Sequence, residues 1–154
     1  MIPIQNTKAV IMLPAQLKDD GDFANNTYVD TQGWNHLRVL FVVGDTDVAA
    51  GDAIGSTAEG TAPKIEECDT TGGSYTDVNG AALADSIQHD EDNKLFAIDI
   101  SLTKKHKRYM RVNAPHSAAG AVNGSNLAIL GILSRPAIGP KDAAGQGLEE
   151  LVTA

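Results

Sequence analysis

The sequence has little cysteine, few cations and no long apolar run. Cys68 is the single cysteine of the 154 residues, which excludes an internal disulfide and a cysteine-based zinc cluster. No stretch approaches the roughly 20 apolar residues of a membrane-spanning helix, and the chain does not open on a secretory signal. The 12 Lys and Arg residues stand against 20 Asp and Glu residues, a net charge of -8, which argues against binding nucleic acid over the whole surface. We therefore expect a soluble protein made in the cytoplasm, with no membrane partner and no direct nucleic-acid partner.

Motifs for catalysis and metal binding are also missing. No Gly-x-Ser-x-Gly elbow, phosphate loop or dinucleotide fingerprint is present, and the four histidines lack ligand spacing. The carboxylate clusters at Asp45, Asp47 and Asp52 and at residues 90–92 lack the spacing of an EF-hand loop, which favours solvated acidic loops. We predict a non-enzymatic protein without catalytic residues, cofactor or metal, although a triad assembled in space from distant residues stays open.

Alternation of apolar and polar residues is the strongest structural signal. Phe96, Ile98, Ile100 and Leu102 recur at every second position, which is the period of a half-buried strand. A basic segment follows and the chain then resumes extended character, so this stretch predicts a β-hairpin with a positively charged tip. Across the chain, the pattern predicts strands near residues 8–13, 36–43, 64–69, 94–102, 108–113 and 127–134.

Turn-forming residues separate these strands. Residues 72–74 predict one turn and Asn79-Gly80 another, while residues 44–63 and 81–93 predict a ragged loop and a long connection. Residues 36–43 become apolar on both faces, which is typical of a central strand covered on each side or buried against a subunit. Because helical windows are few, the pattern favours an all-β sandwich.

The length is that of one domain of ordinary size. We expect residues 1–136 to form the sandwich body, with an N-terminal edge strand that stops at Pro14 because proline lacks the N–H that a sheet ladder needs. Residues 137–154 contain repeated Gly and Pro, and we expect them to leave the body as a C-terminal arm.

Two further features each allow two interpretations. The basic segment predicts either docking onto an acidic partner or a solvated turn whose like charges guard a sheet edge. Trp34, the only tryptophan, precedes an apolar strand and is either a ligand platform or a core or subunit contact.

Several phrases of the sequence resemble the small structural proteins of tailed-bacteriophage virions, of the capsid decoration or cement type. They cover most of the chain: Asn6–Pro14, Asp30–Trp34, Val43–Ala49, Lys64–Asp69, Tyr75–Gly80, Asp92–Ile100, Lys107–Tyr109 and Leu130–Arg135. The resemblance implies a jelly-roll-like body with extended arms that sits as a homotrimer on the outside of an HK97-type shell. It also implies contacts with the major capsid protein, and no catalytic residue.

We predict that the cations near the hairpin tip face the capsid, because they interrupt a strongly acidic chain. This predicted docking set consists of Lys104, Lys105, Lys107, Arg108 and Arg111. The alternative is a glycan-binding or head-fibre adhesion module on the virion, with Trp34, Tyr28 or Tyr75 as the stacking platform.

Overall fold

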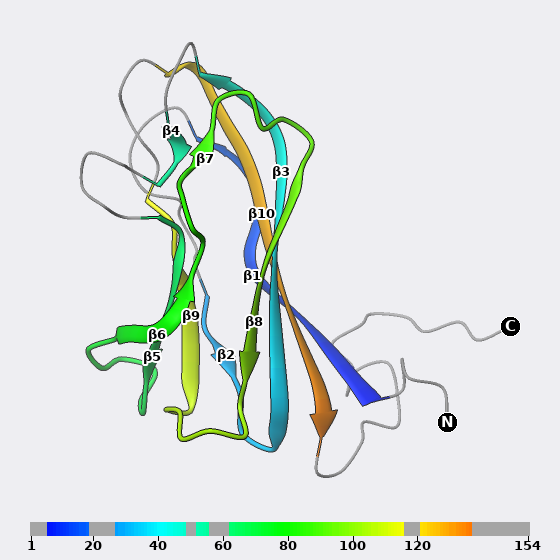
Figure 1. The fold of residues 1–154 in the computed structure, drawn as a ribbon, viewed down its shortest axis with the longest axis vertical. Coiled ribbons are helices and arrows are strands. Elements are labelled where there is room, and N and C mark those ends of the chain that lie inside the picture. The colour runs from blue at the N-terminus through cyan, green and yellow to red at the C-terminus, as the bar shows by residue number, and fades with distance from the viewer. Residues whose placement is uncertain (1–5, 19–26, 49–51, 56–61, 116–120, 137–154) are drawn as a thin grey trace, which may run out of the picture.

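Two four-stranded antiparallel sheets face each other in the computed structural model, which describes residues 6–18, 27–48, 52–55, 62–115 and 121–136 (Figure 1). The first sheet has the order β1-β10-β3-β8, the second has the order β2-β9-β5-β6, and β4 pairs with β7. The strands are β1 (Thr7–Lys18), β2 (Val29–Asp30), β3 (Trp34–Val48), β4 (Asp52–Ile54), β5 (Lys64–Cys68), β6 (Thr76–Ala82), β7 (Ile87–Gln88), β8 (Leu95–Ser101), β9 (Tyr109–Asn113) and β10 (Ala121–Pro136).

The prediction of an all-β sandwich is confirmed. The described residues contain no α-helix, and within them no helix is long and apolar enough to cross a membrane. Each of the strands expected from alternation has an observed counterpart, with β3 and β10 running several residues further than expected. The expected arm at residues 137–154 lies outside the described part of the chain.

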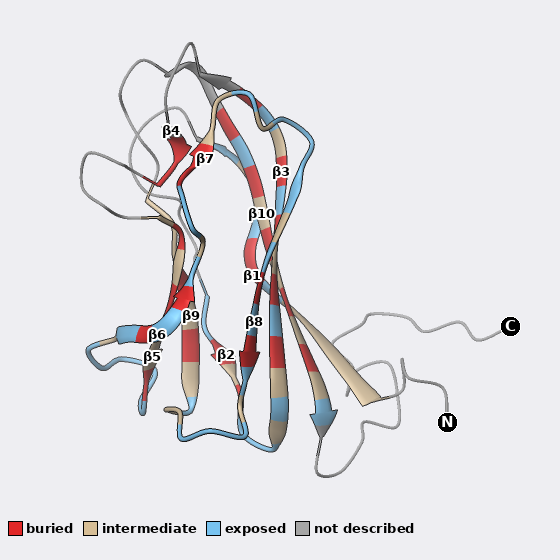
Figure 2. Ribbon diagram, in the orientation of Figure 1, coloured by how far each residue is buried: buried red, intermediate tan, exposed pale blue. Residues whose placement is uncertain are grey.

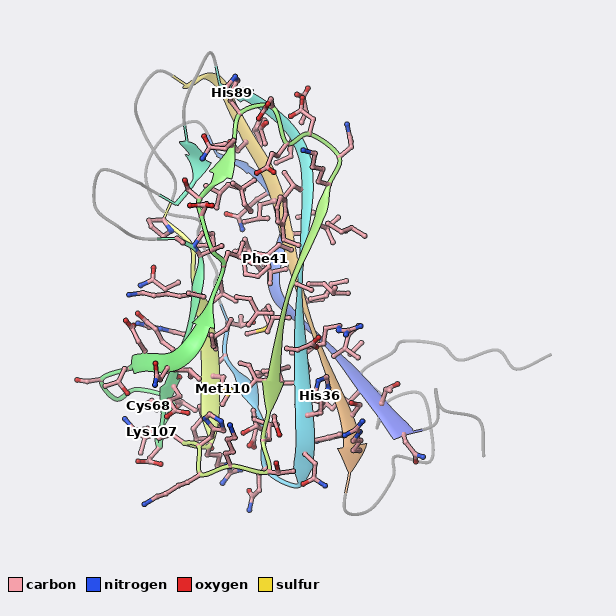
Figure 3. The ribbon with its side chains drawn as sticks, in the orientation of Figure 1. His36, Phe41, Cys68, His89, Lys107 and Met110 are labelled. Atoms are coloured by element: carbon pink, nitrogen blue, oxygen red, sulfur yellow. The ribbon has the colours of Figure 1, made fainter. Side chains whose placement is uncertain are left out.

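The core lies between the two sheets. Buried and exposed residues alternate along β3 and β8, as Figure 2 shows. Leu37, Val39 and Phe41 of β3 are fully buried, and Met110 of β9 and Ile65 of β5 close the core from the second sheet. Figure 3 labels Phe41 and Met110, one from each sheet. Alternation therefore builds this core because each strand turns every second side chain toward the opposite sheet.

The predicted hairpin with a basic tip is wrong. β8 pairs with β3 in the first sheet, whereas β9 pairs with β2 and β5 in the second. Residues 102–108 therefore cross from one sheet to the other. Alternation shows which side chains face the core, but it does not show which strand lies beside which.

Three of the other local predictions also need correction. β6 continues through Asn79-Gly80, where Gly80 has a φ of 78° and the pairing with β5 shifts register. The predicted turn is therefore an irregularity within a strand. A glycine with a positive φ occurs in β-bulges as well as in turns that reverse the chain. The expected loop after residue 44 begins with the end of β3, and the expected connection contains β7.

The turn at residues 72–74 and the edge position of the N-terminal strand are confirmed, but the predicted stop of that strand at Pro14 is wrong. Gly73 lies between β5 and β6, where a Cβ atom would come within 2.6 Å of the Cys68 Sγ. β1 is an edge strand of the first sheet, and its pairing with β10 shifts register between Leu13 and Gln16, on either side of Pro14. The strand nevertheless runs on to Lys18 because an edge strand tolerates a missing donor.

The outer face of the first sheet carries apolar side chains that the second sheet does not cover. Cross-strand register places Ile11, Leu130 and Leu40 in one row and Val42 and Leu95 in the next. Leu95 is 68% exposed, Ile11 61% and Val42 38%. These five residues are called the apolar face below. β3 is thus the predicted central strand, with one of its two apolar faces buried against the second sheet.

Replacing Phe41 with alanine should lower the free energy of unfolding by about 3–5 kcal/mol, because the change leaves a cavity between the sheets. Asp45→Ala, an exposed change in the same strand, should alter it by no more than about 0.5 kcal/mol. Urea denaturation of the two variants measures both values. If both variants lost the same amount of unfolding free energy, Phe41 would not lie in a packed core.

Candidate docking surface

The basic segment lines a shallow hollow of about 430 Å³ at one end of the sandwich. The wall is formed by Leu102, residues 104–108, the turn at residues 31–34 and Asp69. The same end holds the crossing between β8 and β9 and the turn that leads into β3 (Figure 1). The hollow therefore brings the basic segment and Trp34, which are distant in sequence, to one surface.

Glu67 holds the crossing in place. Its carboxylate accepts a hydrogen bond from the backbone N–H of Lys107 at 3.1 Å and lies 2.9 Å from the Nδ1 of His106. The side chains of Glu67 and His106 are both mostly buried. Leaving this carboxylate without partners would cost about 1–3 kcal/mol or more, so the contact fixes the path of the chain.

Arg108 ties the crossing to the neighbouring turn. Its guanidinium donates two hydrogen bonds to the Asp30 carboxylate, at 2.9 and 2.7 Å. The Arg108 carbonyl accepts bonds from the Thr31 hydroxyl at 2.7 Å and the Thr31 N–H at 3.0 Å. The Arg108 hydrogen bond is the largest influence that lowers the pKa of Asp30, so this pair stays ionised well into acid.

The predicted docking cations divide into three groups. Lys104 and Lys105 are exposed in the wall of the hollow and make no ion pair within the described residues. Lys107 donates to the Thr76 hydroxyl at 2.9 Å, and Arg108 is neutralised by Asp30. Arg111 lies on the outer face of the second sheet, where it pairs with Glu66 at 2.9 Å. Among the described residues, the ammonium groups of Lys104, Lys105 and Lys107 therefore have no acidic group bound to them, whereas Arg108 and Arg111 are each paired with a carboxylate.

Trp34 is a core contact, which is one of the two interpretations that the sequence left open. Its side chain packs against the core cluster, yet the residue also lines the basic hollow. Its backbone N–H donates to the Thr31 carbonyl at 3.1 Å, which closes the turn before β3. An apolar wall of this kind gives a partner some contact area beside the charges.

The acidic turn, residues 89–93 between β7 and β8, lies at the end of the molecule opposite to the basic segment. Figure 3 shows His89, which begins this turn, at the end away from Lys107. Asp92 accepts hydrogen bonds from the N–H and the hydroxyl of Thr46, and these bonds lower the pKa of Asp92. The carboxylate therefore braces the end of β3, and in the described ranges no group of three potential metal ligands is found.

A Ser–His–Asp row, which the sequence did not reveal, crosses the outer face of the first sheet. The His36 Nδ1 lies 3.1 Å from the Ser134 Oγ, and the His36 Nε2 lies 3.3 Å from the Asp99 Oδ1. Arg38 binds both Asp99 oxygens at 2.8 Å, and this is the main cause of the lowered Asp99 pKa. A hydrolytic triad also needs oxyanion donors, whereas the backbone of these paired strands is used by the sheet. The row is thus a cross-strand polar contact.

Comparison with known proteins assigns no family. No protein-family model matches the sequence, and no curated protein matches it significantly. Its function has to be inferred from its residues.

Acidification should weaken the anchor of the basic segment. The pKa of Asp30 is lowered from its ordinary value of 3.8, so its stabilising effect is present above that value and is lost as the pH falls through the folded-state pKa. Urea unfolding of the parent should therefore show a stability that declines below about pH 4. Asp30→Asn should be less stable near neutral pH and should decline less steeply in acid. If the free energy of unfolding fell with pH equally steeply in the parent and in Asp30→Asn, this account of Asp30 would be contradicted.

Proposed function

We propose that the protein is a phage capsid decoration protein that binds the outside of an HK97-type shell as a homotrimer and bridges major capsid subunits. The sequence resemblance supports this role, and a jelly-roll-like strand arrangement is part of the proposal. The two facing antiparallel sheets fit such a body. The protein would be made in the host cytoplasm and would end on the exterior of the virion.

The observation that carries the proposal is the uncompensated charge of Lys104 and Lys105. They stand in an open hollow of a chain whose net charge is -8, and the acidic turn is at the far end. An acidic shell would repel most of this protein and attract the basic end, so the protein would approach with that end first.

The anchored crossing makes this end a suitable docking element. The backbone is held on either side of the lysines: the Leu102 N–H donates to the Asn35 carbonyl at 2.9 Å, and the Lys107 N–H donates to Glu67. Little chain entropy is therefore lost on binding. Each lysine contact is weak because both side chains remain hydrated. Three copies in one trimer would multiply such contacts and give stable attachment through avidity.

The apolar face supplies a surface on which copies can meet. Its rows of exposed aliphatic side chains adjoin the Arg38–Asp99 pair, whose charges cancel within the face. Self-association here avoids the repulsion that an acidic chain meets elsewhere, and it removes apolar area from water. The proposal therefore places a second copy of the chain on this face.

Removing the charges of Lys104 and Lys105 should slow docking. Lys104→Gln/Lys105→Gln should add to empty capsid shells about tenfold more slowly at low salt, with a flatter salt dependence. Lys64→Gln/Lys94→Gln removes the same charge from lysines that pair with Asp77 and Glu91, and it should bind nearly as the parent does. Association with immobilised shells can be followed by surface plasmon resonance. If both double variants bind alike, the basic end is only a solvated crossing.

Charging the apolar face should break the trimer. The parent should elute as a trimer at micromolar concentration, and Val42→Glu/Leu95→Glu should elute as a monomer with an unchanged circular dichroism spectrum. Ala82→Glu/Ala84→Glu adds the same charge at exposed positions in and after β6 and should leave the trimer intact. Multi-angle light scattering distinguishes these states. A monomeric parent would rule out the proposed assembly in solution.

A further inference from the structure

The outer face of the second sheet gathers all three tyrosines of the chain. Tyr28 immediately precedes β2, Tyr109 lies on β9, and Tyr75 immediately precedes β6. The rings of Tyr28 and Tyr109 meet edge to face, with centroids 5.3 Å apart. The Arg111 guanidinium lies over the Tyr75 ring, 4.1 Å from its centroid. These three tyrosines and Arg111 are called the tyrosine face below.

The charges on and around this face cancel one another. Glu66 is buried and accepts hydrogen bonds from Arg111 at 2.9 Å and from the Asn113 amide at 2.8 Å. Lys64 pairs with Asp77 at 2.9 Å, and Arg108, which contacts the Tyr109 ring, pairs with Asp30. In the described part of the chain, a charged ligand would therefore have to displace one of these pairs, apart from the Lys107 ammonium, which donates to the Thr76 hydroxyl at 2.9 Å.

The phenol groups remain available to a ligand. Tyr28 is 45% exposed, and the hydroxyls of Tyr28 and Tyr109 make no hydrogen bond within the described part of the chain. The Tyr75 hydroxyl makes only a long contact of 3.5 Å with the Thr71 carbonyl. Burial is the main cause that raises the pKa of Tyr75, so the Tyr75 hydroxyl is a protonated donor at neutral pH. The face thus offers apolar ring surface with polar tips.

We propose that the tyrosine face binds a neutral oligosaccharide. Sugar rings present C–H surfaces that pack on aromatic rings, and their hydroxyls can bond to the phenol tips. A purely apolar ligand would bury these hydroxyls without partners, at a cost of about 1–3 kcal/mol for each. Trp34 is not part of this platform because it lines the basic hollow at the end of the sandwich. The face also lies on the other side of the sandwich from the apolar face, so its binding does not depend on the proposed function.

The test begins with an array of neutral oligosaccharides, and the best ligand is then measured by isothermal titration calorimetry. Tyr28→Ala should weaken binding about tenfold, and Tyr28→Phe, which keeps the ring, should weaken it less. Tyr75→Ala is a second truncation of the platform and should also weaken binding. Lys104→Gln/Lys105→Gln is the matched control outside the face and should bind as the parent does.

Three results would overturn the proposal. One is an array on which no neutral glycan binds, including the case in which the face captures only a protein or an acidic peptide. Another is glycan binding that neither tyrosine truncation changes. The third is glycan binding that the lysine variant abolishes, because it would place the glycan in the basic hollow.

Discussion

The crossing between the two sheets is the constraint on which the candidate site depends. β8 ends in the first sheet and β9 begins in the second, so residues 102–108 have to span the end of the sandwich. Glu67 fixes this span by binding the Lys107 N–H and His106. Where the chain rejoins the second sheet, Lys107 and Arg108 meet Thr76 and Asp30. The two lysines at the middle of the span have no such neighbour among the described residues, which leaves their charge for a partner.

The sandwich separates three kinds of surface. One end is basic, the outer face of the first sheet is apolar, and the outer face of the second sheet is aromatic and electrically compensated. Because the outer faces of two packed sheets point in opposite directions, a partner on one does not obstruct a partner on the other. The proposed shell docking, self-association and glycan binding would therefore be compatible on one copy of the protein.

The sequence was a good guide to strands and a poor guide to their neighbours. Alternation at Phe96, Ile98 and Ile100 predicts β8 because burial on one face is a local property. The partner of β8 is β3, which lies far away in the sequence, and no local pattern reports that pairing. The wrong hairpin prediction, the unpredicted Ser134–His36 contact and the unpredicted anchor at Glu67 have the same cause, because each depends on residues that are far apart in the sequence.

The candidate site was predictable only in part for the same reason. A run of lysines in an acidic chain marks an exposed basic segment, and the structure brings four of the five predicted cations to one end. The neutralisation of Arg108 by Asp30 and of Arg111 by Glu66 depends on register between strands, as does the gathering of the three tyrosines. Composition could show that these residues exist, but it could not show that they share a face.

Hydrogen–deuterium exchange with and without empty capsid shells tests the central claim most directly, because it reports which backbone segments a partner covers. The account predicts slower exchange at residues 31–34 and 102–108 when shells are present, with little change along β6. Protection confined to the second sheet, with the crossing unaffected, would show that the basic end does not face the shell.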